Sequence, residues 1–181
     1  MNYKLFFITS SVKCQKGLSD TEIKNIEDLY QIRFPAEYKT MLKQVLPVGK
    51  GFYNWRDLSE DNIRYIKEMI SQPFKDIYDN ASELDWNDNW GEEPQNKELK
   101  ESIVREKLKE APKLIPLYIH RYMPMMEGKG IPVISVSGTD IIYYGKNLNN
   151  YLRNEFHSTC HDTMDYSEIR EIPFWSEVIM A

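Results

Sequence analysis

The first half of the chain shows helical periodicity that is interrupted by proline and glycine. Ser19 and Glu22 have the spacing of a capping box, and apolar residues then recur every three or four positions, which predicts a helix over 19–30. Pro35 suits the first turn of a second helix. A third helix carries apolar residues at helical spacing from 63 to 70, and we expect it to end at Pro73.

Two shorter apolar segments predict strands in the same half. The amino terminus contains a four-residue apolar run, too short for the core of a signal peptide, and residues 1–8 are therefore interpreted as a strand. The aromatic cluster at 52–55 predicts a second short strand. Alternating charges around regularly spaced apolar residues predict a surface helix over 97–110.

The second half of the chain changes to strand patterns. Apolar runs predict strands over 114–119, 131–136 and 141–144, and the last two are joined by a hairpin turn at 137–140. A helix near 148–156 follows, and the tail at 172–175 is apolar enough to dock on the rest of the protein. Because helices precede strands without β-α-β alternation, the sequence predicts one α+β domain over 1–181, with a central antiparallel sheet and helices around it.

Charge is distributed unevenly along the chain. The net charge is −5, and the window 76–96 contains seven acidic residues but no lysine or arginine. Removing these seven from the 28 acidic residues leaves 21 against 23 basic residues, so the acidity is local. This balance argues against direct nucleic-acid binding, which needs a basic face. Two cysteines and the lack of a long apolar run favour a cytoplasmic protein without membrane contact.

The acidic window also contains aromatic residues, which are enriched at binding hot spots. We therefore predict that this long, partly ordered excursion contacts a basic protein partner, although at least one of its tryptophans is expected to belong to the core. A solvated acidic loop is the alternative. The candidate partner-binding residues are Tyr78, Asp85, Trp86, Asp88, Trp90, Glu92 and Glu93.

A second candidate site follows the strand at 114–119. A cleft there would bind a peptide or a carboxylate, whereas the alternative is a structural ion pair between Arg121 and Asp140. The residues assigned to this candidate pocket are Asn54, Trp55, His120, Arg121, Asp140 and Tyr144.

The most enzyme-like segment is 157–162, which holds a thiol, two imidazoles and a carboxylate. Because His157 follows a predicted helix, it can complement the helix dipole, and nothing in the sequence activates Cys160. Three ligands within six residues cannot encircle a tetrahedral zinc ion. We therefore assign no catalytic residue, metal site or cofactor, and expect that the protein is not an enzyme.

Four groups of residues, in this order, give the chain a resemblance to the SUKH superfamily over 18–175. They are Phe34-Pro35-Ala36-Glu37-Tyr38, Tyr53-Asn54-Trp55-Arg56-Asp57, Trp86 with Trp90-Gly91 and Pro94, and the run from Leu114 through His120-Arg121-Tyr122-Met123-Pro124 to Thr139-Asp140-Ile141-Ile142-Tyr143-Tyr144-Gly145. SUKH proteins include fungal Smi/Knr-type regulators and bacterial immunity proteins. The resemblance implies a compact α+β fold without a cofactor, and a protein-binding role.

Within that role, the leading expectation is an immunity protein that neutralises a basic toxin domain, such as a nuclease, of a polymorphic or contact-dependent toxin system. A regulatory or scaffolding module without a toxin partner is the second expectation. The third is a peptide or small-molecule binder, or an enzyme that uses the region of His120, Arg121 and Asp140. Fold resemblance alone does not select among them.

Overall fold

The computed structural model describes residues 1–157 and 165–181. The first half is mainly helical. Its elements are α1 (Tyr3–Thr9), β1 (Cys14–Lys16), α2 (Asp20–Tyr30), α3 (Ala36–Gln44), β2 (Val45–Pro47), α4 (Glu60–Asp79), the 3-10 turns η1 (Ala81–Glu83) and η2 (Asp88–Trp90), and α5 (Lys97–Leu108).

The second half supplies the main sheet. Its elements are β3 (Leu114–Tyr118), β4 (Arg121–Pro124), β5 (Val133–Ser137), β6 (Asp140–Gly145), α6 (Leu148–Phe156), η3 (Tyr166–Glu168) and α7 (Trp175–Ile179). The strands pair antiparallel in the order β3-β4-β5-β6, and β1 and β2 form a separate two-stranded sheet. The predicted α+β class with an antiparallel sheet is therefore confirmed.

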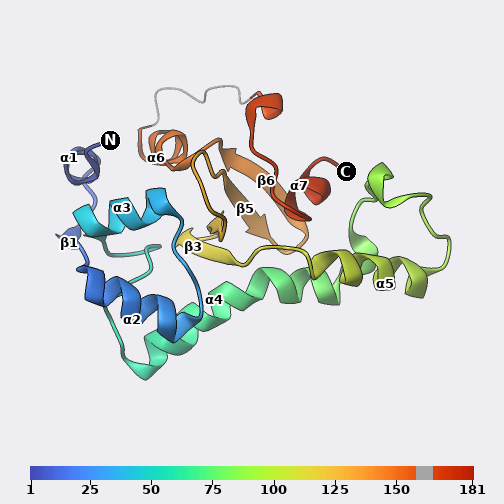
Figure 1. The fold of residues 1–181 in the computed structure, drawn as a ribbon, viewed down its shortest axis with the longest axis horizontal. Coiled ribbons are helices and arrows are strands. Elements are labelled where there is room, and N and C mark those ends of the chain that lie inside the picture. Colours follow the sequence, from blue (N-terminus) through green and yellow to red (C-terminus); the bar gives the residue numbers. More distant parts are fainter. Residues whose placement is uncertain (158–164) are drawn as a thin grey trace.

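Helices cover both faces of the main sheet. Helix α4 runs along the molecule from the end that holds α2 to the end that holds α5 (Figure 1). It contacts β3 at one edge of the sheet, whereas α6 contacts β6 at the other edge. One core joins α2, α3, α6 and the first part of α4 to one face of the sheet. The other core joins the end of α4, α5 and α7 to the opposite face. Because both faces are buried, β3 and β5 are nearly continuous apolar runs rather than alternating ones.

The prediction of a strand at the amino terminus is wrong, because residues 3–9 form α1. Asn2 caps this helix by accepting a hydrogen bond from the backbone N–H of Leu5. Tyr3, Phe6 and Phe7 are buried at helical spacing, whereas the intervening Leu5 is 57% exposed. The apolar run therefore follows a helical period rather than a strand period.

The aromatic segment at 52–55 is also not a strand. Phe52 makes only an isolated bridge to Tyr118. Tight turns follow at once, since the N–H of Trp55 bonds to the carbonyl of Tyr53 and the N–H of Asp57 bonds to that of Asn54. These local bonds replace the sheet ladder that the aromatic composition predicted.

Helix α4 does not end at Pro73 but continues through it to Asp79. Pro73 cannot donate a hydrogen bond to the carbonyl of Met69, which normally costs about 3 kcal/mol in a helix interior. Ile70, Pro73 and Ile77 are all buried on one side of the helix. Tertiary packing therefore overrides the local signal, as it does for most helices in proteins.

The sequence interpretation missed β4, which pairs with both β3 and β5. The connection from β3 is the two-residue turn Ile119-His120, with Ile119 at a φ of 49°. Such turns normally carry Asn, Asp or Gly, so an isoleucine gives no hairpin signal. The predicted hairpin between β5 and β6 is present, with Ser137 paired to Asp140.

Candidate functional site

The acidic excursion between α4 and α5 is tied to the carboxyl-terminal segment by its aromatic residues. The indole N–H of Trp90 donates to Glu177 Oε2 at 2.6 Å, and its ring stacks on Phe174 with 6.1 Å between centroids. Trp86 meets Trp90 edge to face at 5.3 Å and donates to the carbonyl of Gly91. Both tryptophans are half-buried against the second core. Both rings therefore help to hold the excursion against the carboxyl-terminal segment.

Asn87 completes this attachment and was not singled out from the sequence. Its buried side chain donates to the carbonyl of Glu177 at 2.7 Å and accepts from the backbone N–H of Asn89 at 2.9 Å. Asparagine is a preferred residue at helix starts, and Asn87 precedes the short turn η2. The capping preference of asparagine was therefore visible in the sequence. Asparagine is common in loops, however, so this preference alone does not single out Asn87.

Four carboxylates of the excursion are exposed to solvent. Asp85, Asp88, Glu92 and Glu93 are exposed, and Glu93 pairs with Lys100 of α5 at 2.6 Å. Within the described residues, the other three form no ion pair. We call Asp85, Asp88 and Glu92 the acidic platform. It joins an anchored backbone to negative charge that no side chain in 1–157 or 165–181 neutralises.

Tyr78 occupies a different environment from the platform. It lies in the last turn of α4 and is 53% exposed. The guanidinium of Arg105 lies 4.4 Å from the centre of its ring, and Arg105 Nε donates to the carbonyl of Tyr78. A cation of the chain itself therefore already covers one face of this predicted contact residue.

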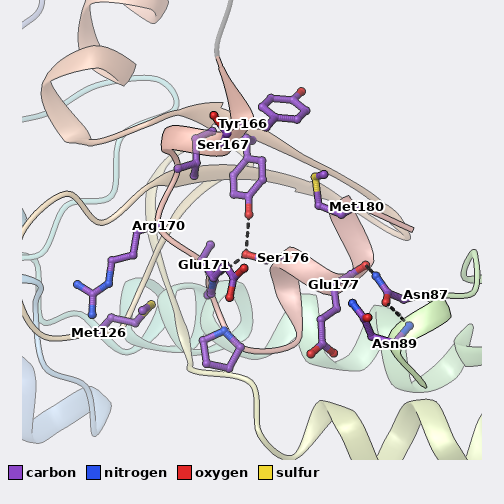
Figure 2. Close-up of a pocket in the computed structure, with 14 residues that line it drawn as sticks. Asn87, Asn89, Met126, Tyr166, Ser167, Arg170, Glu171, Ser176, Glu177 and Met180 are labelled. Atoms are coloured by element: carbon purple, nitrogen blue, oxygen red, sulfur yellow. Dashed lines mark hydrogen bonds between the residues drawn. The ribbon is translucent and has the colours of Figure 1, made fainter. Parts of the chain in front are cut away.

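A pocket of about 700 Å³ adjoins the excursion and is lined mainly by the carboxyl-terminal segment (Figure 2). Asn87 and Asn89 lie at one end of it, and Arg170 and Met126 lie at the other. Arg170 is engaged with the backbone, because it donates to the carbonyl of Glu127 at 2.6 Å.

The central polar group of this pocket is the hydroxyl of Ser176. It accepts from the phenol of Tyr143 at 2.5 Å and from the backbone N–H of Ile172 at 2.7 Å (Figure 2). Burial, and then the nearby carboxylate of Glu171, raise the pKa of Tyr143, whereas its bond to Ser176 acts in the opposite direction. The phenol therefore stays a neutral donor at pH 7. These bonds fix the carboxyl-terminal segment on β6, so the pocket is best explained as a consequence of that docking.

Of the six residues of the predicted second pocket, the structure brings Arg121 and Tyr144 into contact, but it does not gather all six in one cavity. Trp55 is buried in the first core, where its indole N–H donates to the hydroxyl of Tyr38 at 2.9 Å. Asn54 lies in the loop before α4, and its carbonyl accepts from Asn62. Asp140 is exposed at the start of β6.

The predicted ion pair between Arg121 and Asp140 is wrong. Arg121 lies over the ring of Tyr144 at 3.6 Å, donates to Ser135 at 2.8 Å and approaches Glu155 of α6 at 3.5 Å. Successive residues of a strand point to opposite faces, so Arg121 faces α6 while Tyr122 packs in the other core. Arg121 and Tyr144 therefore connect the sheet to α6.

His120 lines a separate groove of about 330 Å³ between α4 and the sheet, which we call the α4 groove. Burial, and then the neighbouring Arg121, lower the pKa of His120, so its ring is neutral at pH 7. The lining residues are Tyr53, Tyr65, Met69, Gln72, Pro73, Asp76, Ile119, His120, Tyr122, Val136, Ser137 and Gly138. The helical residues share one face of α4, because they recur at spacings of three and four. Of the six residues predicted for a pocket, this groove contains only His120.

The enzyme-like segment is described only at its first residue. His157 is the C-cap residue of α6, stacks on Phe6 with 4.6 Å between ring centres and forms a hydrogen bond to Ser10 through Nε2. Cys160, His161 and Asp162 lie outside the described residues. In the part of the chain that the structure describes, no cluster of three or more His, Cys, Asp or Glu residues could hold a metal ion.

None of the described helices combines the length and the apolar character needed to span a bilayer. The sequence matches no family model, and no curated protein and no solved structure is significantly similar to it.

Proposed function

We propose that the protein is a protein-binding module that docks a basic partner on the acidic platform. The observation that carries this proposal is the contrast between the anchored backbone and the free carboxylates of the excursion. Trp90 and Asn87 fix the loop to the carboxyl-terminal segment, while Asp85, Asp88 and Glu92 remain exposed. A surface that is already ordered loses less conformational entropy when it binds.

The charge of the platform favours encounter with a cationic surface. Unneutralised charges of one sign raise the local concentration of an oppositely charged partner and speed its association. Each exposed ion pair adds little contact energy by itself, usually below about 1 kcal/mol. We therefore expect the platform to act mainly on the association rate, and to weaken as salt shortens the screening length to about 8 Å at physiological strength.

The resemblance to SUKH proteins suggests what the partner would be. A nuclease toxin needs lysines and arginines to bind phosphates. Covering that surface with a carboxylate-rich protein would exclude the substrate by charge and by volume. A regulatory or scaffolding partner with a basic surface would use the same platform, and the presence of a toxin gene beside the gene for this chain would favour the first role.

The proposal is tested by affinity capture with three forms of the protein. One is the wild type, and one carries Asp85→Lys, Asp88→Lys and Glu92→Lys. The third is a matched control with Asp28→Lys, Glu60→Lys and Glu68→Lys, which changes the net charge equally on exposed positions of α2 and α4. Captured proteins are identified by mass spectrometry, and their association rates are measured at several salt concentrations.

We expect one basic protein to be retained by the wild type and by the control, but not by the platform variant. Its association with the wild type should slow at least about tenfold between low and physiological salt. Equal retention and equal association rates for all three forms would rule out docking on the platform.

A further inference from the structure

The α4 groove combines apolar walls with one carboxylate. Met69 and Pro73 of α4 line it on one side, and Ile119 and Val136 of the sheet line it on another. Among the described residues that line it, Asp76 is the acidic one and none is a lysine or arginine. The groove therefore has an apolar surface for an aliphatic chain and a negative charge for a cation.

The carboxylate of Asp76 has no cationic partner in residues 1–157 and 165–181. Gln72 Nε2 donates to its Oδ1 at 2.7 Å, and none of the ion pairs of the described chain includes it. His120, the other ionisable side chain besides the tyrosines, has a lowered pKa and is neutral at pH 7. The groove consequently carries a net negative charge that an incoming cation would neutralise.

Three tyrosines add aromatic rings and phenol oxygens to the same groove. Tyr53 and Tyr65 are stacked, with 5.8 Å between their centroids, and Tyr65 is 49% exposed at the surface. Burial, and then the charges of Asp76 and Tyr65, raise the pKa of Tyr122 to about 12. Aromatic faces attract cations within about 6 Å.

A strained turn forms one wall of the groove. Ile119 has a φ of 49°, a left-handed conformation that is rare for a β-branched residue. Its N–H bonds to the carbonyl of Gly51 at 2.8 Å, and its carbonyl accepts from the phenol of Tyr53 at 2.5 Å. The side chain nevertheless remains 50% exposed. Such backbone strain concentrates at ligand clamps and binding sites.

We propose that the α4 groove receives a lysine or arginine side chain of a protein partner, with Asp76 as the counter-ion. The aliphatic stem would lie against Met69, Pro73 and Ile119, as the stems of long cationic side chains do on apolar surfaces. The charged end would meet the carboxylate and the phenol oxygens. This inference takes the basic character of the partner from the proposed function, but it concerns a groove that contains no residue of the acidic platform.

The test uses small probes, so it is independent of the proposed partner. N-acetyl-lysine methylamide and N-acetyl-arginine methylamide are titrated into the full chain, with N-acetyl-norleucine methylamide as the neutral analogue of lysine. NMR follows the methyl groups of Met69, Ile119 and Val136. We expect saturable shifts with the two cationic probes, and a Kd at least about fivefold weaker for the neutral probe.

Two variants test whether Asp76 causes the preference for cationic probes. Asp76→Asn keeps the shape of the side chain and should remove the preference for cationic over neutral probes. Asp85→Asn removes a platform charge instead and should leave the preference unchanged. A comparison of thermal midpoints shows whether each variant is folded. If Asp76→Asn does not fold, the salt dependence of the wild type replaces it, because only the binding of cationic probes should weaken with salt.

The inference is overturned if the cationic probes give no saturable shifts at these methyl groups, or if the neutral probe binds equally well. Survival of the preference in a folded Asp76→Asn protein would overturn it too. Failure of the platform would appear differently. In that case the probe titrations would succeed, while the platform variant captured the same basic partner as the wild type.

Discussion

The acidic excursion and the α4 groove use the same kinds of residue in opposite orientations. In the excursion, Trp90 packs inward on Phe174 while Asp85 and Asp88 project into solvent. In the groove, Tyr53, Tyr65 and Asp76 are all lining residues. Both regions are acidic and aromatic, but their physical roles differ.

Exposed and partly enclosed carboxylates affect different steps of binding: the first speed the association of a charged partner, and the second hold one of its side chains. Exposed carboxylates act through a field that salt screens, and they contribute little energy at contact. A partly enclosed carboxylate is screened less and interacts more strongly with a cation at the same distance. An acidic stretch in a sequence therefore indicates where a field originates, but not where a partner's side chain is held. Asp76 belongs to the same acidic window as the platform, yet it faces another site.

The largest expected effect tests whether Trp90 anchors the excursion. Trp90→Ala removes the stacking on Phe174 and the bond to Glu177. Because the side chain is only half-buried, we expect the free energy of unfolding to fall by about 3 kcal/mol, near the lower end for such truncations. Urea denaturation measures this change.

Trp90→Phe is the matched control, because it keeps a ring against Phe174 but cannot donate to Glu177. It should cost about 1 kcal/mol, the typical loss of one hydrogen bond. A loss below about 0.5 kcal/mol for Trp90→Ala would mean that the ring does not hold the loop, and the contrast with the groove would disappear.

The next largest effect concerns Asn87. Asn87→Ala leaves the carbonyl of Glu177 and the N–H of Asn89 without their partner in the described structure. One hydrogen bond typically contributes about 1 kcal/mol, so the loss of these two should lower the unfolding free energy by about 2 kcal/mol. Asn89→Ala is the comparison, because only the backbone of Asn89 takes part, and it should change stability by less than about 0.5 kcal/mol. Equal losses for both variants would contradict the role of the Asn87 side chain.

Local signals predicted the elements that local chemistry determines. The capping box at Ser19 and Glu22 is present at the start of α2, and Gly138 turns the β5–β6 hairpin at a φ of 63°. Pro73 and Ile119 misled the interpretation for the opposite reason. Pro73 is kept inside α4 by packing against residues distant in sequence. The backbone of Ile119 is held by hydrogen bonds to Gly51 and Tyr53. A short window of sequence contains neither kind of partner.

The candidate site shows the same division. Charge is visible in sequence, so the exposure of Asp85, Asp88 and Glu92 agrees with the acidic window. The direction of each side chain is not visible. It depended on β4, and without that strand His120 and Arg121 were placed in one pocket although they serve opposite faces of the sheet. His120 belongs to the turn before β4, whereas Arg121 is the first residue of that strand and faces α6.

A smaller effect should distinguish the aromatic residues of the groove from those of the excursion. Tyr65 is half exposed and stacks on Tyr53, which is buried. Tyr65→Ala should lower the unfolding free energy by no more than about 1 kcal/mol, the worth of one exposed aromatic pair. Urea denaturation beside Trp90→Ala gives a direct comparison. A loss as large as that of Trp90→Ala would show that Tyr65, too, serves mainly as an anchor.

The smallest expected effect tests whether Asp76 acts on the groove interior. Burial is the first cause of the raised pKa of Tyr122, and the charge of Asp76 is the second. Asp76→Asn should therefore lower this pKa from about 12, but not to the ordinary value of 10.0. A raised tyrosine pKa contributes stability that is complete below pH 10 and is lost as the pH rises toward 12. In the Asp76→Asn variant this loss of stability should be complete at a lower pH.

Carbon-13 NMR of the tyrosine Cζ atoms at pH 11 should show more phenolate at Tyr122 in Asp76→Asn than in the wild type, while Asp85→Asn should match the wild type. If Tyr122 ionises identically in all three proteins, the carboxylate of Asp76 does not act on the interior of the groove. The groove and the acidic platform would then not differ in where their carboxylates act.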